Sequence, residues 1–346
     1  MKQSSMKLTV GAALCASILP IHAAQVPQEQ KPFEYPGYFR ATQTWWLQMI
    51  PVPLAVAFDN RSRAIVVSSK QRTARLYDKA TNQQSWEYLD CNSGDAGLIF
   101  VEGVLYLASR NGNIGRLDQN KNTVQKITSN RSPFFCMAAS KNKLFLGAMN
   151  DTIVRINRGT DVLAASGSHN FGTYETDYHG SASGWVNALH VVDDTLISGN
   201  YTGEIACCNT ETGTRTVLGD HNGHPVTAFA HQGNIVYSGA NFTCPNNDIS
   251  EIRMWDIRAA KPLCNNMKNY GTGVHAMVCL PNGYLAVGRD KGMIMLHDMR
   301  TFQVAETICT RYGENYGSIT ALTTTDDGGI ISTNSNGLVH VWKEKK

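Results

Sequence analysis

The chain has 346 residues, an apolar fraction of 42% and a formal net charge of +3. No long run of like charges occurs, which excludes the basic stripe of a typical nucleic-acid-binding protein and an acidic tail. Length alone predicts two domains, unless the chain is built from internal repeats.

Residues 1–24 have the layout of a secretory signal peptide. Lys2 and Lys7 precede an uncharged apolar run over residues 8–21, and small residues at Ala23 and Ala24 follow it. The apolar run is too short to span a bilayer comfortably. We therefore expect cleavage and export by a bacterium to the periplasm or the exterior. The alternative is a cytoplasmic protein in which this segment is an N-terminal tail.

Residues 25–40 hold three prolines and few aliphatic side chains, which predicts an extended linker. The following stretch, residues 41–49, reads ATQTWWLQM and is rich in β-prone and aromatic residues. No helical periodicity of any length occurs after the signal region, so the expected fold class is all-β.

Eight cysteines follow Cys15, and an even number in an exported protein permits disulfides. Some of these cysteines lie within predicted strands, where they are expected to be unpaired apolar residues: Cys136, Cys207, Cys208 and Cys279. The others lie in or near predicted loops and are the better disulfide candidates: Cys91, Cys244, Cys264 and Cys309. Their pairing stays open.

The chain repeats itself at a spacing of roughly forty residues, the period of propeller blades. Seven units begin with an alternating apolar strand, which starts at Leu54, Leu98, Phe134, Val186, Val226, Val274 or Ile319. A short turn leads to a second strand that ends in small residues, such as Ser238-Gly239. Small residues there allow neighbouring strands to approach closely.

The clearest unit runs from His221 to Arg258. Gly223-His224 opens it, and Trp255-Asp256 closes its third strand. This unit resembles one repeat of the WD-repeat family, the β-propeller scaffold proteins. The resemblance implies a seven-bladed β-propeller over residues 41–346. It also implies that His221 or His224 is hydrogen-bonded toward Ser238.

The last unit, residues 318–346, supplies only three strands. We predict that residues 41–49 complete this blade as its outer strand, which leaves no unpaired edge at the join.

The resemblance further implies a non-catalytic protein-interaction scaffold without cofactor or metal. In this family the loops between blades and the turns after second strands lie on one face. One residue per blade is then expected at the rim: Lys70, Arg110, Met149, Asn200, Ala240, Arg289 and Asn334. Three cations and no carboxylate predict a mildly positive rim.

The loops between blades add Tyr178, Trp185, Tyr270, Tyr312 and Tyr316 to this face. Tyr, Trp and Arg dominate the energetics of protein interfaces. The predicted partner-binding residues are therefore these five aromatic residues with Lys70, Arg110, Asn200, Arg289 and Asn334. The other interpretation is that all of them are ordinary loop residues. We expect a protein partner, no nucleic acid, no membrane span after signal removal, and a monomer.

Catalytic patterns are scarce. Residues 179–184 lack the Gly-x-Ser-x-Gly pattern of a nucleophile turn. The Asp193-Asp194 and Asp326-Asp327 pairs fall in tight turns, where aspartate is favoured for backbone geometry. The histidines show no metal-ligand spacing. The sequence thus favours a protein that is not an enzyme. The alternative function is an exported propeller enzyme or carbohydrate-binding protein, with the long loops around Tyr178 and Asn247 as its site.

Overall fold

The fold was analysed from a computed structural model, which describes residues 39–46, 53–59, 64–69, 74–78, 84–88, 95–118, 123–129, 133–149, 152–158, 185–241, 249–263, 267–270, 273–309 and 317–344. All of them belong to one compact unit, Pro36–Lys346. In these ranges the chain forms β-strands and one 3-10 turn, η1 (Asp290–Gly292), and no α-helix. The all-β prediction is confirmed. The predicted signal peptide and most of the predicted linker lie outside the described residues.

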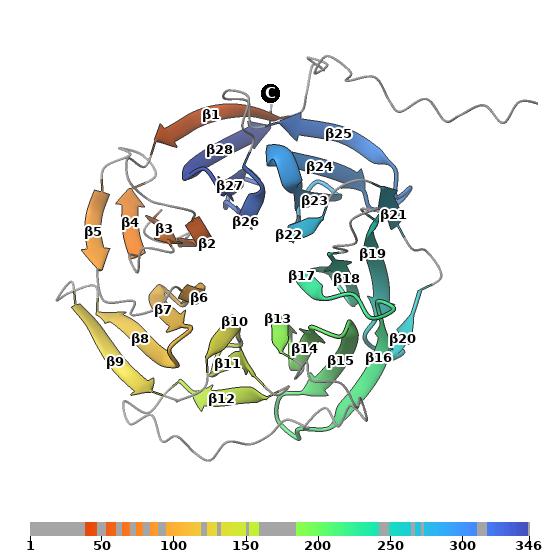
Figure 1. Cartoon of the computed structure of the whole chain (residues 1–346), viewed down its shortest axis with the longest axis horizontal. Coiled ribbons are helices and arrows are strands. Elements are labelled where there is room, and N and C mark those ends of the chain that lie inside the picture. Colours follow the sequence, from red (N-terminus) through yellow and green to blue (C-terminus); the bar gives the residue numbers. More distant parts are fainter. Residues whose placement is uncertain are drawn as a thin grey trace, which may run out of the picture. The chain divides into compact units, whose positions relative to one another are not determined.

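The strands of the described ranges form seven antiparallel sheets (Figure 1). The first three sheets follow the predicted units closely. They comprise β2 (Pro53–Asp59), β3 (Ala64–Ser69), β4 (Ala74–Asp78) and β5 (Gln84–Tyr88); β6 (Asp95–Val101), β7 (Val104–Ser109), β8 (Asn113–Asp118) and β9 (Thr123–Ser129); and β10 (Phe134–Ala139), β11 (Lys143–Ala148) and β12 (Ile153–Asn157).

The next three sheets begin after residues 159–184, which lie outside the described ranges. They comprise β13 (Val186–Val192), β14 (Thr195–Asn200), β15 (Glu204–Asn209) and β16 (Arg215–Asp220); β17 (Val226–Gln232), β18 (Ile235–Ala240) and β19 (Ile249–Asp256), with β20 (Lys261–Pro262) and β21 (Met267–Tyr270) both paired to β19; and β22 (Val274–Cys279), β23 (Tyr284–Arg289), β24 (Met293–Asp298) and β25 (Val304–Cys309).

The last sheet joins the two ends of the described chain. It contains β26 (Ile319–Thr324), β27 (Ile330–Asn334) and β28 (Leu338–Glu344), and β1 (Phe39–Trp46) pairs with β28. The register runs from Phe39 opposite Glu344 to Trp46 opposite Leu338. The predicted pairing of the N-terminal strand with the last unit is therefore confirmed. The strand begins at Phe39, inside the stretch predicted as linker.

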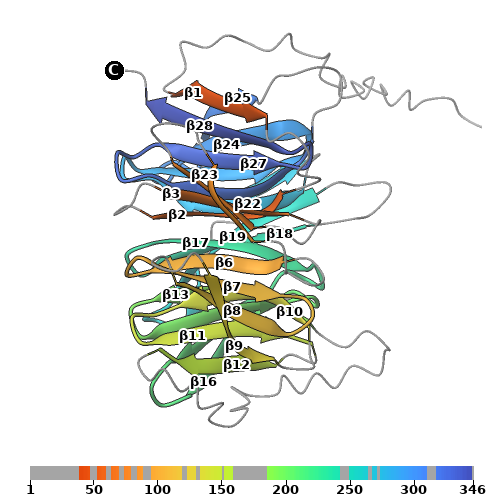
Figure 2. The ribbon, with the colours of Figure 1, turned by 90° about the vertical axis from the view of Figure 1, so that its left-hand side faces the viewer.

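Neighbouring sheets contact each other through their first strands. β2 contacts β6, β6 contacts β10, and the succession continues through β13, β17, β22 and β26, which contacts β2 again. In Figure 1 the first strands can be followed in this order, from β2 through β6, β10, β13, β17 and β22 to β26. In Figure 2 the β6–β9 and β10–β12 sheets lie side by side.

Glycines near the ends of second strands allow several of these contacts. A Cβ atom added to Gly199, Gly239 or Gly288 would lie 2.4–2.5 Å from a methyl carbon of the first residue of the next sheet: Val226, Val274 or Ile319 respectively. Real Cβ atoms do not approach a neighbour so closely. The small residues that end the second strands are thus required for sheet-to-sheet packing, as the sequence indicates.

Every first strand carries a β-bulge after its first residue. The registers shift between residues 53 and 55, 95 and 97, 134 and 136, 186 and 188, 226 and 228, 274 and 276, and 319 and 321. A bulge leaves one residue outside the ladder and turns its side chain away from the regular alternation. In β10 that residue is Phe135.

The cysteines within the strands match their prediction. Cys136, Cys207, Cys208 and Cys279 are free and buried or half-buried. Cys91, Cys244 and Cys264 lie outside the described residues, as does the side chain of Cys309.

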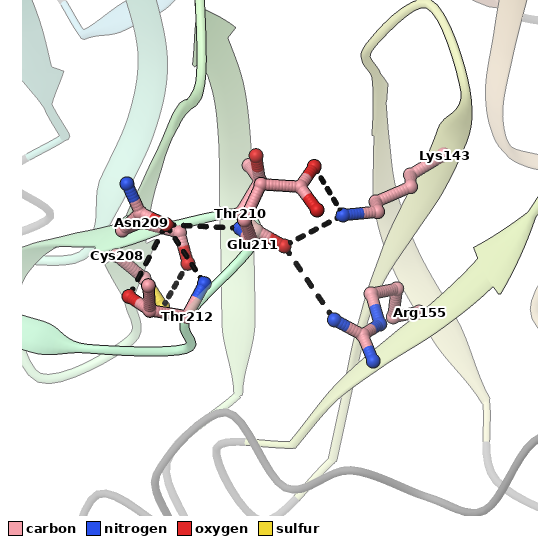
Figure 3. A network of polar contacts seen from close by, with 7 residues as sticks. All are labelled: Lys143, Arg155, Cys208, Asn209, Thr210, Glu211 and Thr212. Atoms are coloured by element: carbon pink, nitrogen blue, oxygen red, sulfur yellow. Dashed lines mark hydrogen bonds and ion pairs between the residues drawn. The ribbon is translucent and has the colours of Figure 1, made fainter.

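A network of hydrogen bonds connects the β10–β12 sheet to the β13–β16 sheet (Figure 3). Lys143 on β11 donates through Nζ to the carbonyl oxygen of Thr210 at 2.9 Å and to Glu211 Oε1 at 2.5 Å. Arg155 on β12 reaches the same carbonyl at 3.5 Å. Thr210 is buried, so its carbonyl depends on these donors for a hydrogen bond.

We predict that Lys143→Met lowers the free energy of unfolding by about 1–3 kcal/mol, because the buried carbonyl of Thr210 loses its nearest donor. The side chain of Lys143 is 11% exposed, whereas that of Glu211 is 66% exposed. Glu211→Gln should therefore cost less than about 1 kcal/mol. Chemical denaturation of the two variants measures the difference, and equal losses would contradict the assignment.

Candidate functional site

Four side chains from three neighbouring sheets form a continuous aromatic stack. The rings of Phe135 and Trp185 are parallel within 6°, with centroids 5.0 Å apart. The ring of Tyr201 lies 5.6 Å from Trp185 at an interplanar angle of 51°. The guanidinium carbon of Arg110 lies 5.9 Å from the centroid of Phe135, within the range of a cation–π contact. We call these four residues the aromatic stack.

The fold brings these residues to one end of their sheets. Arg110 directly follows β7, and Tyr201 directly follows β14. Trp185 directly precedes β13, and its carbonyl oxygen accepts a hydrogen bond from the Tyr201 N–H at 2.8 Å. Phe135 is the bulged residue of β10. First strands begin and second strands end at this end of each sheet, which we call the turn face.

The exposed parts of the stack are polar and aromatic. Arg110 is exposed, and Tyr201 is 44% exposed. Trp185 is half-buried, and its Nε1 atom is shielded from solvent without a hydrogen-bond partner among the described residues. Within the same part of the chain, no carboxylate forms an ion pair with Arg110. The stack is therefore an accessible surface that offers hydrogen-bond donors beside aromatic rings.

Two of the predicted partner-binding residues, Arg110 and Trp185, are thus brought together. Two other members of the stack, Phe135 and Tyr201, were not predicted. The signal for Tyr201 is the turn after the second strand: Ser109-Arg110-Asn111-Gly112 aligns with Asn200-Tyr201-Thr202-Gly203. In both turns the Gly N–H bonds to the carbonyl of the first residue, at 3.0 and 3.2 Å.

The same alignment corrects the predicted rim for Asn200, Arg289 and Asn334, which are buried. They occupy the position of Ser109, and the following residue is the less buried one in each turn: Tyr201 is exposed, and Asp290 and Ser335 are half-buried. Asn200 Oδ1 accepts hydrogen bonds from Thr202 Oγ1 and the Glu204 N–H, both at 2.9 Å. Asn334 Oδ1 accepts from the backbone of Asn336 and Leu338 at 3.1 and 3.0 Å, so both asparagines hold turns in place.

Arg289 donates from Nη1 to Ser250 Oγ at 2.6 Å in the protein interior. Burial lowers the pKa of its guanidinium to about 10. The residue at the surface position is Asp290. The expected rim of three cations without a carboxylate is therefore wrong at this sheet, which presents a carboxylate instead.

Asp290 is the centre of a small polar cluster on the turn face. Its Oδ1 atom lies 2.7 Å from both His275 Nε2 and Ser318 Oγ, and its Oδ2 accepts from the Gly273 N–H at 2.9 Å. Burial raises the pKa of this carboxyl, but the hydrogen bonds outweigh burial and leave it lowered. Ser318 contacts the carboxylate rather than the imidazole, so the described cluster lacks the nucleophile–base contact of a hydrolase.

A second polar cluster has the connectivity of a catalytic triad, but it lies buried in the protein interior. Ser238 Oγ lies 2.7 Å from His221 Nε2, and His221 Nδ1 lies 3.5 Å from Glu251 Oε2. Both His221 and Ser238 are fully buried, and Ser238 also accepts a hydrogen bond from Trp255 Nε1 at 2.7 Å. No substrate can reach this serine. The hydrogen bond to Ser238 implied by the family resemblance is present, and together with the Trp255 contact it connects the turn before β17 to β18 and β19.

Burial and hydrogen bonding set the protonation states of this second cluster. Burial lowers the pKa of His221, so the imidazole is neutral. Burial raises the pKa of Glu251, but hydrogen bonds with His221 and Arg253 outweigh it and bring the pKa to about 2. A neutral imidazole beside an ionised carboxylate is also the resting state of a catalytic triad, so it is burial that separates this cluster from one.

The remaining predicted binding residues lie beyond what the structure describes. Lys70, Tyr178, Tyr312 and Tyr316 are outside the described residues, and Tyr270 lies in β21 with its side chain outside them. Among the described residues, no three His, Cys, Asp or Glu side chains are grouped so as to hold a metal ion. The described ranges also contain no helix with the length and apolar character of a membrane span.

We predict that Ser238→Ala lowers the free energy of unfolding by about 2–4 kcal/mol, because it leaves polar groups of both His221 and Trp255 buried without a partner. Ser332 supplies a matched control, since its Oγ accepts one hydrogen bond, from Trp342 Nε1 at 2.8 Å. Ser332→Ala should cost about half as much. Denaturant titration of both variants checks the order, and a smaller loss for Ser238→Ala would refute it.

No protein-family model matches this chain, and neither does any curated protein.

Proposed function

We propose that this chain is a seven-bladed β-propeller of the WD-repeat type that serves as a non-catalytic scaffold for protein interactions. The repeat spacing, the seven antiparallel sheets and the closed succession of contacts between first strands support this fold. The buried contact of His221 and Trp255 with Ser238 supports the resemblance to that family.

The observation that carries the function is the aromatic stack on the turn face. Large aromatic side chains and arginine contribute most of the binding energy at protein interfaces. Arg110, Phe135, Trp185 and Tyr201 combine these types over three neighbouring sheets, with Arg110 and Tyr201 exposed. A surface of this composition supports recognition of a protein segment laid across the ends of the first strands.

An exported enzyme or carbohydrate-binding protein is the second candidate. The His275–Asp290–Ser318 cluster is the observation that favours an enzyme, because it gathers an imidazole and a carboxylate on the turn face. Its hydrogen bonds connect the β22–β25 sheet to the residue before β26, which supports a structural role as well. We infer export from the N-terminal pattern of residues 1–24, and N-terminal sequencing of the protein from its native host tests it.

The interaction proposal is tested by affinity capture from the native compartment, with mass spectrometry of the bound proteins. Trp185→Ala should weaken binding of the captured partner by at least about 2 kcal/mol, or roughly 30-fold in affinity. The control is Val217→Ala, which removes an apolar side chain that is 46% exposed on the outer strand β16. Both variants must melt like the parent.

Equal retention of every captured protein by the parent and by Trp185→Ala would exclude the stack as the binding surface. A bound oligosaccharide that depends on Trp185, in place of a protein, would favour the second candidate.

A further inference from the structure

We propose that the aromatic stack binds an acidic peptide segment, with a carboxylate on Arg110 at one end of the stack and an apolar side chain on Tyr201 at the other end. This inference rests on the proposed scaffold function and specifies its partner. It follows from the donors, the charge and the exposed apolar area of the stack.

The aromatic stack offers more hydrogen-bond donors than acceptors. Arg110 carries a guanidinium with five N–H donors and no acceptor, and Trp185 contributes one indole N–H. The Trp185 Nε1 atom is shielded from solvent and has no acceptor among the described residues. Because this N–H is shielded, the donors that a ligand can reach are those of the exposed Arg110 guanidinium. The complementary ligand is rich in acceptors.

The charge selects an anionic acceptor. Arg110 is exposed, lies over the face of Phe135, and pairs with no carboxylate in the described part of the chain. A guanidinium that stacks on an aromatic ring can still bind a carboxylate through two parallel hydrogen bonds. A single arginine suits one carboxylate, whereas phosphorylated segments are typically bound by clusters of arginines.

The exposed apolar ring at the other end of the stack favours a ligand that is larger than a free anion. Tyr201 is one of three large apolar side chains that are exposed in the described ranges, and the other two, Val217 and Val304, belong to outer strands. The exposed ring of Tyr201, at the opposite end of the stack from Arg110, is thus suited to an aromatic or aliphatic side chain. A peptide that carries an acidic residue and, further along the chain, an apolar one satisfies both ends of the stack.

The test uses a displayed library of short random peptides selected against the purified full chain. For the tightest binder, a synthetic copy with every Asp and Glu replaced by Asn and Gln serves as the uncharged match. Fluorescence anisotropy then measures the affinity of both peptides for the parent protein and for three variants: Arg110→Met, Tyr201→Ala and, as a control, Arg258→Met. Arg258 is an exposed arginine in the turn after β19.

We expect acidic residues to be enriched among the selected peptides. Arg110→Met should lower the affinity for the acidic peptide about tenfold and the affinity for its uncharged match less than about twofold. Arg258→Met should change neither affinity. Equal weakening of the two peptides by Arg110→Met, or selection of peptides without acidic residues, would overturn the inference. If such peptides still lose affinity with Tyr201→Ala, the scaffold function stands. If neither Arg110→Met nor Tyr201→Ala changes the affinity, both the inference and the proposed site are contradicted.

Discussion

The structure depends on one steric constraint: at four successive contacts between sheets, the first strand closely approaches a glycine of the preceding sheet. Gly199 beside Val226 and Gly239 beside Val274 leave no room for a Cβ atom. The valines at these contacts are fully buried, so the tight approach also removes apolar surface from water. Since first strands contact one another in a closed succession, a larger residue at one glycine would shift two sheets.

This constraint also builds the aromatic stack. At Val186, Val226, Val274 and Ile319 the first residue of the first strand points into the sheet-to-sheet contact, and the bulge that follows releases the next side chain from the ladder. In β10 the buried Phe134 fills the contact and Phe135 is released to the turn face, where it meets Arg110 and Trp185. Packing and recognition are therefore consequences of the same strand geometry.

The sequence predicted the repeat, the all-β class and the pairing of the N-terminal strand with β28, because these features follow from a forty-residue period and from small residues at strand ends. It did not predict which side chain of each turn is exposed. Asn200 and Arg289 are buried, whereas Tyr201 and Asp290 take the surface position. Side chains alternate with a period of two, so an error of one residue exchanges the interior and the surface.

The central claim, that the turn face around Tyr201 binds a protein partner, is tested most directly by photo-crosslinking in the native host. A photo-reactive phenylalanine analogue placed at position 201 should form a covalent adduct with a discrete partner protein. The same analogue at position 304, an exposed valine on the outer strand β25, should not. The absence of an adduct at 201, or the same adducts at both positions, would contradict the account.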